Sequence, residues 1–352
     1  MKILVRATNW LGDAVIAIPA LREIRRAHPG AEIVILARPW VADLYGREDF
    51  CDRLLPYEHN ARHAGLAGKL RLAAALRAEN FDTAILLQNA FDAALLAWLA
   101  RIPNRIGYAR DGRRLLLTKA VPVPRDGDVP AHQRYYYLEL LRGAGIIAEL
   151  PECADIRLAA AEQAAQEGKA YWKRHGVNAA RWIGVSPGAA YGTAKRWLPE
   201  RFAAAASTLA DRLDARIAVF GSAAEAELCH LVAGQIGPRA HNLAGKTTLA
   251  EFIQLAAACT VFLTNDSGAM HVSAALGVPT VAVFGATDDV ATGPSAAWAR
   301  VVRRHVECSP CLLRECPIDH RCMTAVEASY VVEEACSLLR ENGVVVPSSL
   351  SA

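Results

Sequence analysis

The sequence lacks an uninterrupted hydrophobic run of the ~20 residues that a membrane-spanning helix requires. The best candidate, 83–100, contains Gln88, Asn89 and Asp92. Near the start, an apolar run of three residues ends at Arg6, which is too short for the core of a signal peptide. We therefore expect a cytoplasmic protein without a transmembrane segment.

The sequence also lacks a strong excess of one charge. Its 39 Lys and Arg residues nearly balance 36 Asp and Glu, for a net charge of +3, which argues against a dedicated nucleic-acid binder. The small positive charge is unevenly distributed, since residues 1–150 carry 21 basic and 16 acidic side chains. We therefore expect an anionic partner to bind this half of the chain. The nine cysteines are odd in number and scattered among apolar stretches, which argues against a disulfide scaffold.

The composition that remains is typical of a globular α/β protein. Of the 352 residues, 53% are hydrophobic and 21% are charged, which suits about two domains with ordinary cores. Short β-branched runs alternate with stretches rich in Ala, Leu and Arg, a pattern that predicts parallel sheets covered by helices. The predicted strands are 2–6, 32–37, 82–87, 105–108, 182–186, 216–220, 261–264, 280–284 and 300–303.

These strands form two groups of similar architecture, so we predict two Rossmann-like domains whose parallel sheets face each other across a cleft. The linker is expected near 175–181, which gives an N-terminal domain of 1–175 and a C-terminal domain of 176–325. A last helix is predicted within the C-terminal segment 326–352. Ligands of such sheets bind beyond the carboxyl ends of the strands, so the residues that follow each strand are the functional candidates.

Small, polar and ionisable residues follow the strands of the second half, and they suit a nucleotide diphosphate. A helix N-terminus offers free N–H groups to phosphate, and glycine lets the backbone come close. Lysine and arginine neutralise phosphate charge, and an acidic residue can bind ribose hydroxyls. The candidates are Gly188, Lys195, Arg196, Gly221, Ser222, Glu225, Asp266, Ser267, Gly268 and His271.

Several of these candidates have a plainer explanation when each is taken alone. Lys195 and Arg196 could be a solvated basic pair. Asp266 could be a helix N-cap, and His271 could be a structural histidine.

Asp13 is the candidate of the first half, because it follows Gly12 at the start of the helix after the first strand. A carboxylate held there could act as a general base on an attacking hydroxyl, which typically contributes ~10²–10⁴-fold to the rate. The alternative is an ordinary first-turn acid that the helix dipole favours.

A cysteine-rich segment near the end allows two interpretations. Cys308, Cys311, Cys316 and Cys322, with His320 nearby, could ligate a structural zinc or an iron–sulfur cluster. Their spacing is short and irregular, so we favour reduced thiols that pack a loop and predict no metal site.

Five blocks of the sequence together resemble a known family. They are 9–13, with Asn9-Trp10-Leu11-Gly12-Asp13, then 187–197, 220–222, 242–247 and 265–271, with Asn265-Asp266-Ser267-Gly268-Ala269-Met270-His271. In this order they resemble the ADP-heptose:lipopolysaccharide heptosyltransferases, glycosyltransferase family 9. The resemblance covers nearly the whole chain.

The resemblance implies a GT-B fold in which the segment 326–352 returns to the first domain. It implies an inverting transfer of heptose from ADP-L-glycero-D-manno-heptose to the inner-core heptose of lipopolysaccharide, heptosyl-Kdo₂-lipid A, at the inner face of the cytoplasmic membrane. Asp13 matches the proposed base, Lys195 matches the phosphate-binding lysine, and no cofactor or divalent metal is implied. Tyr191 stands where some members have threonine.

The acceptor of this reaction is acidic, and the basic segment 101–125 is a candidate contact for it, although an ordinary solvated basic face is the alternative. Other family members that act on a different core acceptor remain open as alternatives. So do a GT-B epimerase and, last, a non-catalytic nucleotide-sugar binder. The predicted acceptor-binding residues are Asn9, Trp10, Gly12, Arg105 and Arg113.

Overall fold

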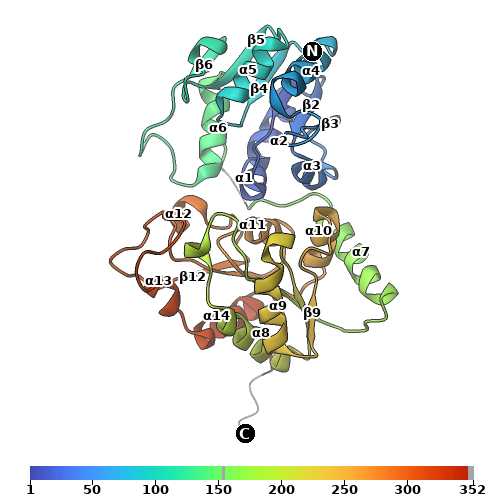
Figure 1. The fold of residues 1–352 in the computed structure, drawn as a ribbon, viewed down its shortest axis with the longest axis vertical. Coiled ribbons are helices and arrows are strands. Elements are labelled where there is room, and N and C mark those ends of the chain that lie inside the picture. Colours follow the sequence, from blue (N-terminus) through green and yellow to red (C-terminus); the bar gives the residue numbers. More distant parts are fainter. Residues whose placement is uncertain (153–154, 348–352) are drawn as a thin grey trace. The chain divides into compact units, whose positions relative to one another are not determined.

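The computed structural model describes residues 1–152 and 155–347, which belong to two compact units, Met1–Cys153 and Ala154–Ala352. Each unit is a parallel sheet packed between helices (Figure 1). The fold class predicted from the sequence, α/β with two Rossmann-like domains, is confirmed.

Unit 1 is built on a six-stranded sheet with the order β3-β2-β1-β4-β5-β6, which is the Rossmann order. Its central strands are buried on both faces, which is why they appear in the sequence as nearly continuous apolar runs. The strands are β1 (Lys2–Arg6), β2 (Glu32–Ala37), β3 (Arg53–Pro56), β4 (Thr83–Leu86), β5 (Asn104–Tyr108) and β6 (Lys119–Val121). The helices are α1 (Leu11–Ile16), α2 (Ile18–Ala27), α3 (Pro39–Tyr45), α4 (Gly65–Ala78), α5 (Phe91–Leu99), the 3₁₀ turn η1 (Arg114–Leu116) and α6 (Gln133–Gly143).

Unit 2 repeats this topology, with the strand order β12-β11-β10-β7-β8-β9. The strands are β7 (Trp182–Ser186), β8 (Arg216–Val219), β9 (Ala240–Asn242), β10 (Val261–Asn265), β11 (Thr280–Val283) and β12 (Ala299–Val302). The helices are α7 (Ala161–Arg174), η2 (Thr193–Lys195), α8 (Pro199–Leu213), η3 (Ala223–Glu225), α9 (Ala226–Ile236), α10 (Leu249–Ala257), α11 (Gly268–Ala275), α12 (Asp289–Thr292), α13 (Arg321–Thr324) and α14 (Ala328–Glu341).

The boundary between the units differs from the predicted one at residue 175, because α7 belongs to unit 2. This helix packs along α10. Its Trp172 stacks on Trp182 of β7, with ring centroids 3.7 Å apart and planes within 10° of parallel. Both indoles are buried, so α7 is part of the second core.

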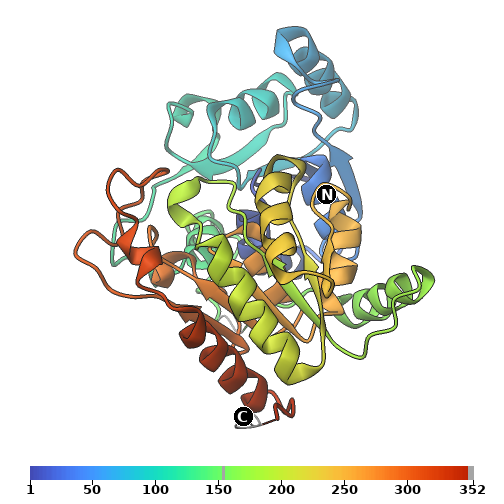
Figure 2. The ribbon, with the colours of Figure 1, turned by 60° about the horizontal axis from the view of Figure 1, so that its bottom comes forward.

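The last helix also differs from the prediction that it returns to the first domain. The apolar face of α14, with Val331, Val332, Ala335 and Leu339, is buried in the core of unit 2. The helix runs beside α8 (dark red in Figure 2) and contacts β11 and β12. Burial of this face on the second sheet is the physical reason for the difference.

Within residues 1–152 and 155–347, no helix combines the length and the hydropathy needed to cross a lipid bilayer.

Candidate functional site

Each sheet has a switch point where its strand order reverses, between β1 and β4 in unit 1 and between β7 and β10 in unit 2. In sheets of this type a ligand binds beyond the carboxyl ends of the strands at the switch point. In unit 2 the residues found there are the segment 187–197 after β7 and the segment 266–268 after β10. The topology therefore brings together two of the segments singled out in the sequence.

The centre of the unit 2 site is an ion pair between Lys195 and Asp266. The Lys195 Nζ donates to Asp266 Oδ2 at 2.5 Å, and the two side chains are only 13% and 6% exposed. The hydroxyl of Thr287, which follows β11, donates to the same carboxylate oxygen at 2.6 Å. These two donors fix the carboxylate, which in turn holds the ammonium group at the carboxyl edge of the sheet.

Asn265, at the end of β10, fixes the loop that carries Lys195. Its amide Nδ2 donates to the carbonyl of Pro187 at 2.7 Å, and its Oδ1 accepts from the backbone N–H of Trp197 at 2.9 Å. The Trp197 indole is itself buried and donates to the carbonyl of Val326 at 3.0 Å. The loop is thus anchored at both ends, and Lys195 lies between the anchors.

Gly188 and Gly221 are glycines because their surroundings leave no room for a side chain. A Cβ on Gly188 would overlap the carboxylate of Glu225, and a Cβ on Gly221 would come within 2.5 Å of Cys229 Sγ. Glu225 accepts from the N–H and the hydroxyl of Ser222, both at 2.8 Å, in a capping box. The structure therefore gives Glu225 a capping role, and its contact with a ribose stays a prediction.

The N-terminus of α11 adds positive potential to this edge. Its N-cap is Ser267, so the plain explanation of Asp266 as the N-cap is removed. No side-chain hydrogen bond caps this described helix end, which leaves the first-turn N–H groups, starting at Gly268, available to an anion. Ser267 Oγ lies 3.1 Å from Thr264 Oγ1, and His271 is buried one turn into the helix.

Aromatic and cationic groups surround Lys195. Its Nζ lies 4.9 Å from the centroid of the Tyr191 ring, and the guanidinium of Arg314 lies 5.1 Å from the same ring. The hydroxyl of Tyr191 donates to the carbonyl of Leu312 at 3.0 Å. Arg196 is half-buried, and its Nε is buried without a partner among the residues that the structure describes. Two cationic side chains, those of Lys195 and Arg314, thus flank the Tyr191 ring.

In unit 1, Asp13 lies in the first turn of α1, directly beyond the carboxyl end of β1. Its carboxylate is half-buried, and its charge reaches two buried phenols. Burial raises the pKa of Tyr137 well above its usual value, and the negative charge of Asp13 adds to that effect. The pKa of Tyr45 is raised by burial first and then by Cys51 and Asp13. Asp13 therefore lies at the edge of the apolar core, where its side chain interacts with Tyr45 and Tyr137.

The loop before Asp13 is held by arginines that the sequence analysis did not select. Asn9 Oδ1 accepts from Arg6 Nη2 at 2.8 Å and from Arg38 Nε at 3.4 Å. Arg6 is 3% exposed, stacks 4.7 Å from the Tyr57 ring centroid, and has an Nε without a hydrogen-bond partner in the described part of the chain. Burial lowers the pKa of Arg6 to about 10. An arginine inside an apolar strand is the signal that could have identified it.

The predicted acceptor residues are placed in two different ways. Trp10 is 58% exposed, and the neighbouring Gly12 is half-exposed at the carboxyl edge of the sheet. Arg113 is completely buried, and its guanidinium donates to the carbonyls of Tyr108 and Gln88 and to the Asn89 side chain, so it ties two strand ends together.

The guanidinium of Arg105 likewise donates hydrogen bonds to backbone carbonyls, those of Leu116 at 2.6 Å and Ile102 at 2.5 Å. The structure thus gives Arg105 and Arg113 bracing roles. The burial of Arg113 removes it from the surface, whereas Arg105 is partly exposed and its acceptor contact stays a prediction.

The four cysteines of the segment 308–322 are free thiols. Burial raises the pKa of Cys322, and the thiols of Cys308, Cys311 and Cys316 add to that effect. In the parts of the chain that the structure describes, no group of three or more His, Cys, Asp or Glu side chains is arranged to hold a metal ion.

Two Rossmann-ordered sheets, one with an anchored lysine beside an uncapped helix N-terminus, define a two-unit α/β protein of the nucleotide-binding fold type. The family model described as glycosyltransferase family 9 (heptosyltransferase) matches residues 69–321. The chain belongs to this family, and it is a glycosyltransferase.

Curated relatives and a solved structure agree with this assignment. The chain is 30% identical to lipopolysaccharide heptosyltransferase 2 of Salmonella typhimurium over 98% of this chain and 100% of the relative. It is 31% identical to lipopolysaccharide heptosyltransferase 2 of Escherichia coli over 86% of this chain and 88% of the relative. The solved E. coli ADP-heptose LPS heptosyltransferase II superposes with a TM-score of 0.81 at 29% identity, covering 98% of this chain and 100% of that chain.

Proposed function

We propose that this protein transfers heptose from ADP-heptose to the inner-core heptose of lipopolysaccharide. Its relatives are named lipopolysaccharide heptosyltransferase 2 and ADP-heptose LPS heptosyltransferase II. The observation that carries the proposal is the Lys195–Asp266–Thr287 centre at the switch point of unit 2. Lys195 and the N-terminus of α11 supply positive charge and N–H donors, which a diphosphate requires. Unit 2 is therefore the donor unit of this proposal.

Lys195 stabilises the leaving group in the proposed reaction. As the bond between the anomeric carbon and the diphosphate oxygen breaks, negative charge develops on ADP. An ammonium group fixed beforehand by a buried carboxylate stabilises that charge without reorganisation. No bound cofactor or divalent cation is assigned a step, because Lys195 supplies the cation.

Asp13 is the general base of the proposed reaction. The acceptor hydroxyl attacks the anomeric carbon from the side opposite the diphosphate, gives its proton to Asp13, and forms the new glycosidic bond as ADP departs. This displacement inverts the anomeric configuration. The proposed acceptor contacts are Asn9, Trp10 and Gly12, which lie with Asp13 at the carboxyl edge of the unit 1 sheet.

The test of this function is the Asp13→Ala variant. We expect ADP binding, measured by calorimetry, to stay at the wild-type level, while transfer to a truncated lipopolysaccharide acceptor falls by about 10²–10⁴-fold. Asp43→Asn, at an exposed aspartate of α3, is the matched control and should keep full activity. Full transfer activity in Asp13→Ala would reject this mechanism.

Mass spectrometry of the products made from defined truncated acceptors separates the type II reaction from the alternatives. Heptose added only to acceptors that already carry the first heptose supports type II. Heptose added directly to the Kdo₂ acceptor would indicate the type I reaction. We place the reaction at the inner face of the cytoplasmic membrane, where a lipid-linked acceptor made in the cytoplasm is held.

A further inference from the structure

A surface of unit 1 formed by three neighbouring elements exposes large apolar side chains. Helices α4 and α5 pack against each other, and η1 packs against α5. On these three elements Leu66 is 71% exposed, Leu70 is 47%, Trp98 is 49% and Leu115 is 93%. We call the outer surface of α4, α5 and η1 the α4–α5 face. Apolar side chains concentrated on adjacent elements indicate an interaction site more strongly than scattered ones do.

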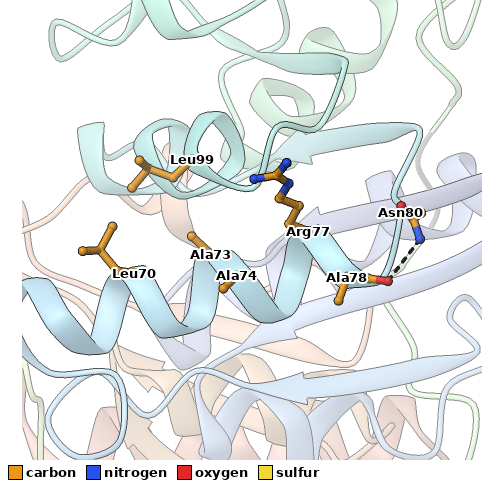
Figure 3. A pocket seen from close by; sticks show the side chains of 7 residues that line it. All are labelled: Leu70, Ala73, Ala74, Arg77, Ala78, Asn80 and Leu99. Atoms are coloured by element: carbon orange, nitrogen blue, oxygen red, sulfur yellow. Dashed lines mark hydrogen bonds between the residues drawn. The ribbon is translucent and has the colours of Figure 1, made fainter.

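A shallow groove runs between the two helices of this face (Figure 3). It has a volume of about 460 Å³. Leu70 of α4 and Leu99 of α5 lie towards one end, and the Arg77 guanidinium lies towards the other, with alanine methyl groups of α4 between them. The groove thus combines an apolar lining with one cationic group, which suits the interfacial region of a lipid.

The segment that forms α4 and the turn before it carries charge of one sign. Residues 61–78 contain four basic residues, Arg62, Lys69, Arg71 and Arg77, and no acidic residue. Lys69 is paired with Asp92 at 2.5 Å, whereas the described residues form no ion pair with Arg71 or Arg77.

The direction of the pKa shift of His63 agrees with the excess of basic residues in this segment. The pKa of His63 is lowered by burial first and then by the positive charge of Arg62, with a smaller contribution of the same sign from Arg71 and an opposing one from Glu58.

We propose that the α4–α5 face docks this protein on an anionic lipid surface, with Leu66, Leu70 and Trp98 entering the interface and Arg71 and Arg77 meeting lipid phosphates. Apolar side chains interleaved with arginines, and few acids, are the composition of an interfacial helix on an anionic membrane. The inference rests on the proposed function, because a lipid-linked acceptor requires the enzyme to work at a membrane surface.

A second copy of this chain fits the face less well than a lipid surface does. A two-fold interface would set this surface against itself and bring the unpaired arginines of both copies together. Anionic lipid headgroups neutralise the same arginines, so the charge pattern favours the membrane.

The experiment measures partition of the full-length protein onto phosphatidylcholine vesicles with and without phosphatidylglycerol. We expect binding only to the anionic vesicles, lowered by raised salt. Arg71→Gln with Arg77→Gln should lower the partition coefficient by about 30-fold. Leu66→Ser with Leu70→Ser should lower it by about tenfold or more. The matched controls in unit 2 are Lys173→Gln with Arg174→Gln on α7 and Leu231→Ser on α9, which should bind like the wild type.

Three results would overturn the inference. They are equal binding of wild type and face variants, equal losses in the unit 2 controls, and a change of oligomeric state in the face variants by light scattering. Transfer to a short water-soluble acceptor should be the same in wild type and face variants. Failure of the proposed function would appear as no transfer by the wild type to any acceptor, which is distinct from unchanged vesicle binding of the variants.

Discussion

At Lys195 the side chain is fixed before any ligand arrives, by a carboxylate that is itself held by Thr287. Removal of the ammonium group should therefore weaken the binding of ADP directly. We expect Lys195→Ala to raise the dissociation constant for ADP by about 10–100-fold, since hydrogen bonds to charged groups contribute about 1.5–3 kcal/mol. Calorimetry measures this. Lys173→Ala, at an exposed lysine of α7, should leave the affinity unchanged, and an unchanged affinity in Lys195→Ala would remove the phosphate role.

The sequence identified both members of the central ion pair, Lys195 and Asp266, but not their pairing. It missed Thr287 and Asn265 because their role depends on which strands are neighbours. β10 lies between β7 and β11, and that order brings distant segments to one edge. A threonine or an asparagine in a single loop carries no distinguishing signal, whereas Arg6 could have been noticed as a charge within an apolar strand.

At the scale of the elements, the packing of α7 against α10 depends on a close approach of the two helix backbones. Gly168 of α7 faces the carbonyl of Gln254 in α10, and a Cβ there would overlap that backbone oxygen. We expect Gly168→Ala to lower the free energy of unfolding by about 1–3 kcal/mol, because a backbone group cannot move aside cheaply. Thermal denaturation measures it.

Gly234 of α9 is the matched control, since no atom lies within 4 Å of a Cβ placed there. Gly234→Ala should leave stability unchanged or raise it by about 0.5–1 kcal/mol, because alanine favours the helix. Equal effects of the two substitutions would contradict the close approach of α7 and α10.

The capping box at the start of α10 makes stability depend on pH. Glu251 accepts from the N–H and the hydroxyl of Thr248, and these bonds hold the pKa of Glu251 below its usual value. A lowered folded-state pKa stabilises the fold above the unfolded-state pKa of about 4.3 and loses that contribution as the pH falls through the folded value. Glu251→Gln should thus lower the Tm at pH 7, and the difference from wild type should shrink below about pH 4.

Glu227→Gln, at an exposed first-turn glutamate of α9, controls for the removal of a surface charge. A Glu251→Gln difference that is the same at neutral and acid pH would contradict the role of the carboxylate in the cap.

The strands that the sequence did not predict share a physical cause. β3, β6 and β9 are edge strands, three or four residues long and partly exposed. A short strand with one free edge needs no continuous apolar run, so its sequence resembles a loop. The central strands, buried on both faces, were predicted almost to the residue.

For the whole molecule, the proposed chemistry predicts independence from divalent cations. Transfer should continue at the full rate in excess EDTA, because Lys195 is the cation assigned to the diphosphate. A rate that falls with EDTA and returns with magnesium would contradict this assignment. Elemental analysis of the same preparation tests the cysteine segment, where we expect metal well below one equivalent.

The two-unit organisation was predictable because the strand pattern occurs twice, but the boundary was not. The helical pattern of α7 is the same whichever sheet receives it, and its contacts with α10 and the stacking of Trp172 on Trp182 place it in unit 2. The same holds for α14, whose amphipathic sequence predicts a buried face but not the partner that buries it.

The near-parallel Trp172–Trp182 pair has a spectroscopic consequence. Two indoles so close couple their electronic transitions, and coupled transitions whose moments are not parallel give a circular-dichroism couplet that an isolated indole lacks. One ring belongs to α7 and the other to β7. The couplet is therefore present only while α7 is packed against the sheet of unit 2. The couplet thus reports whether α7 is packed on the rest of unit 2, and the Trp172→Phe substitution would abolish it.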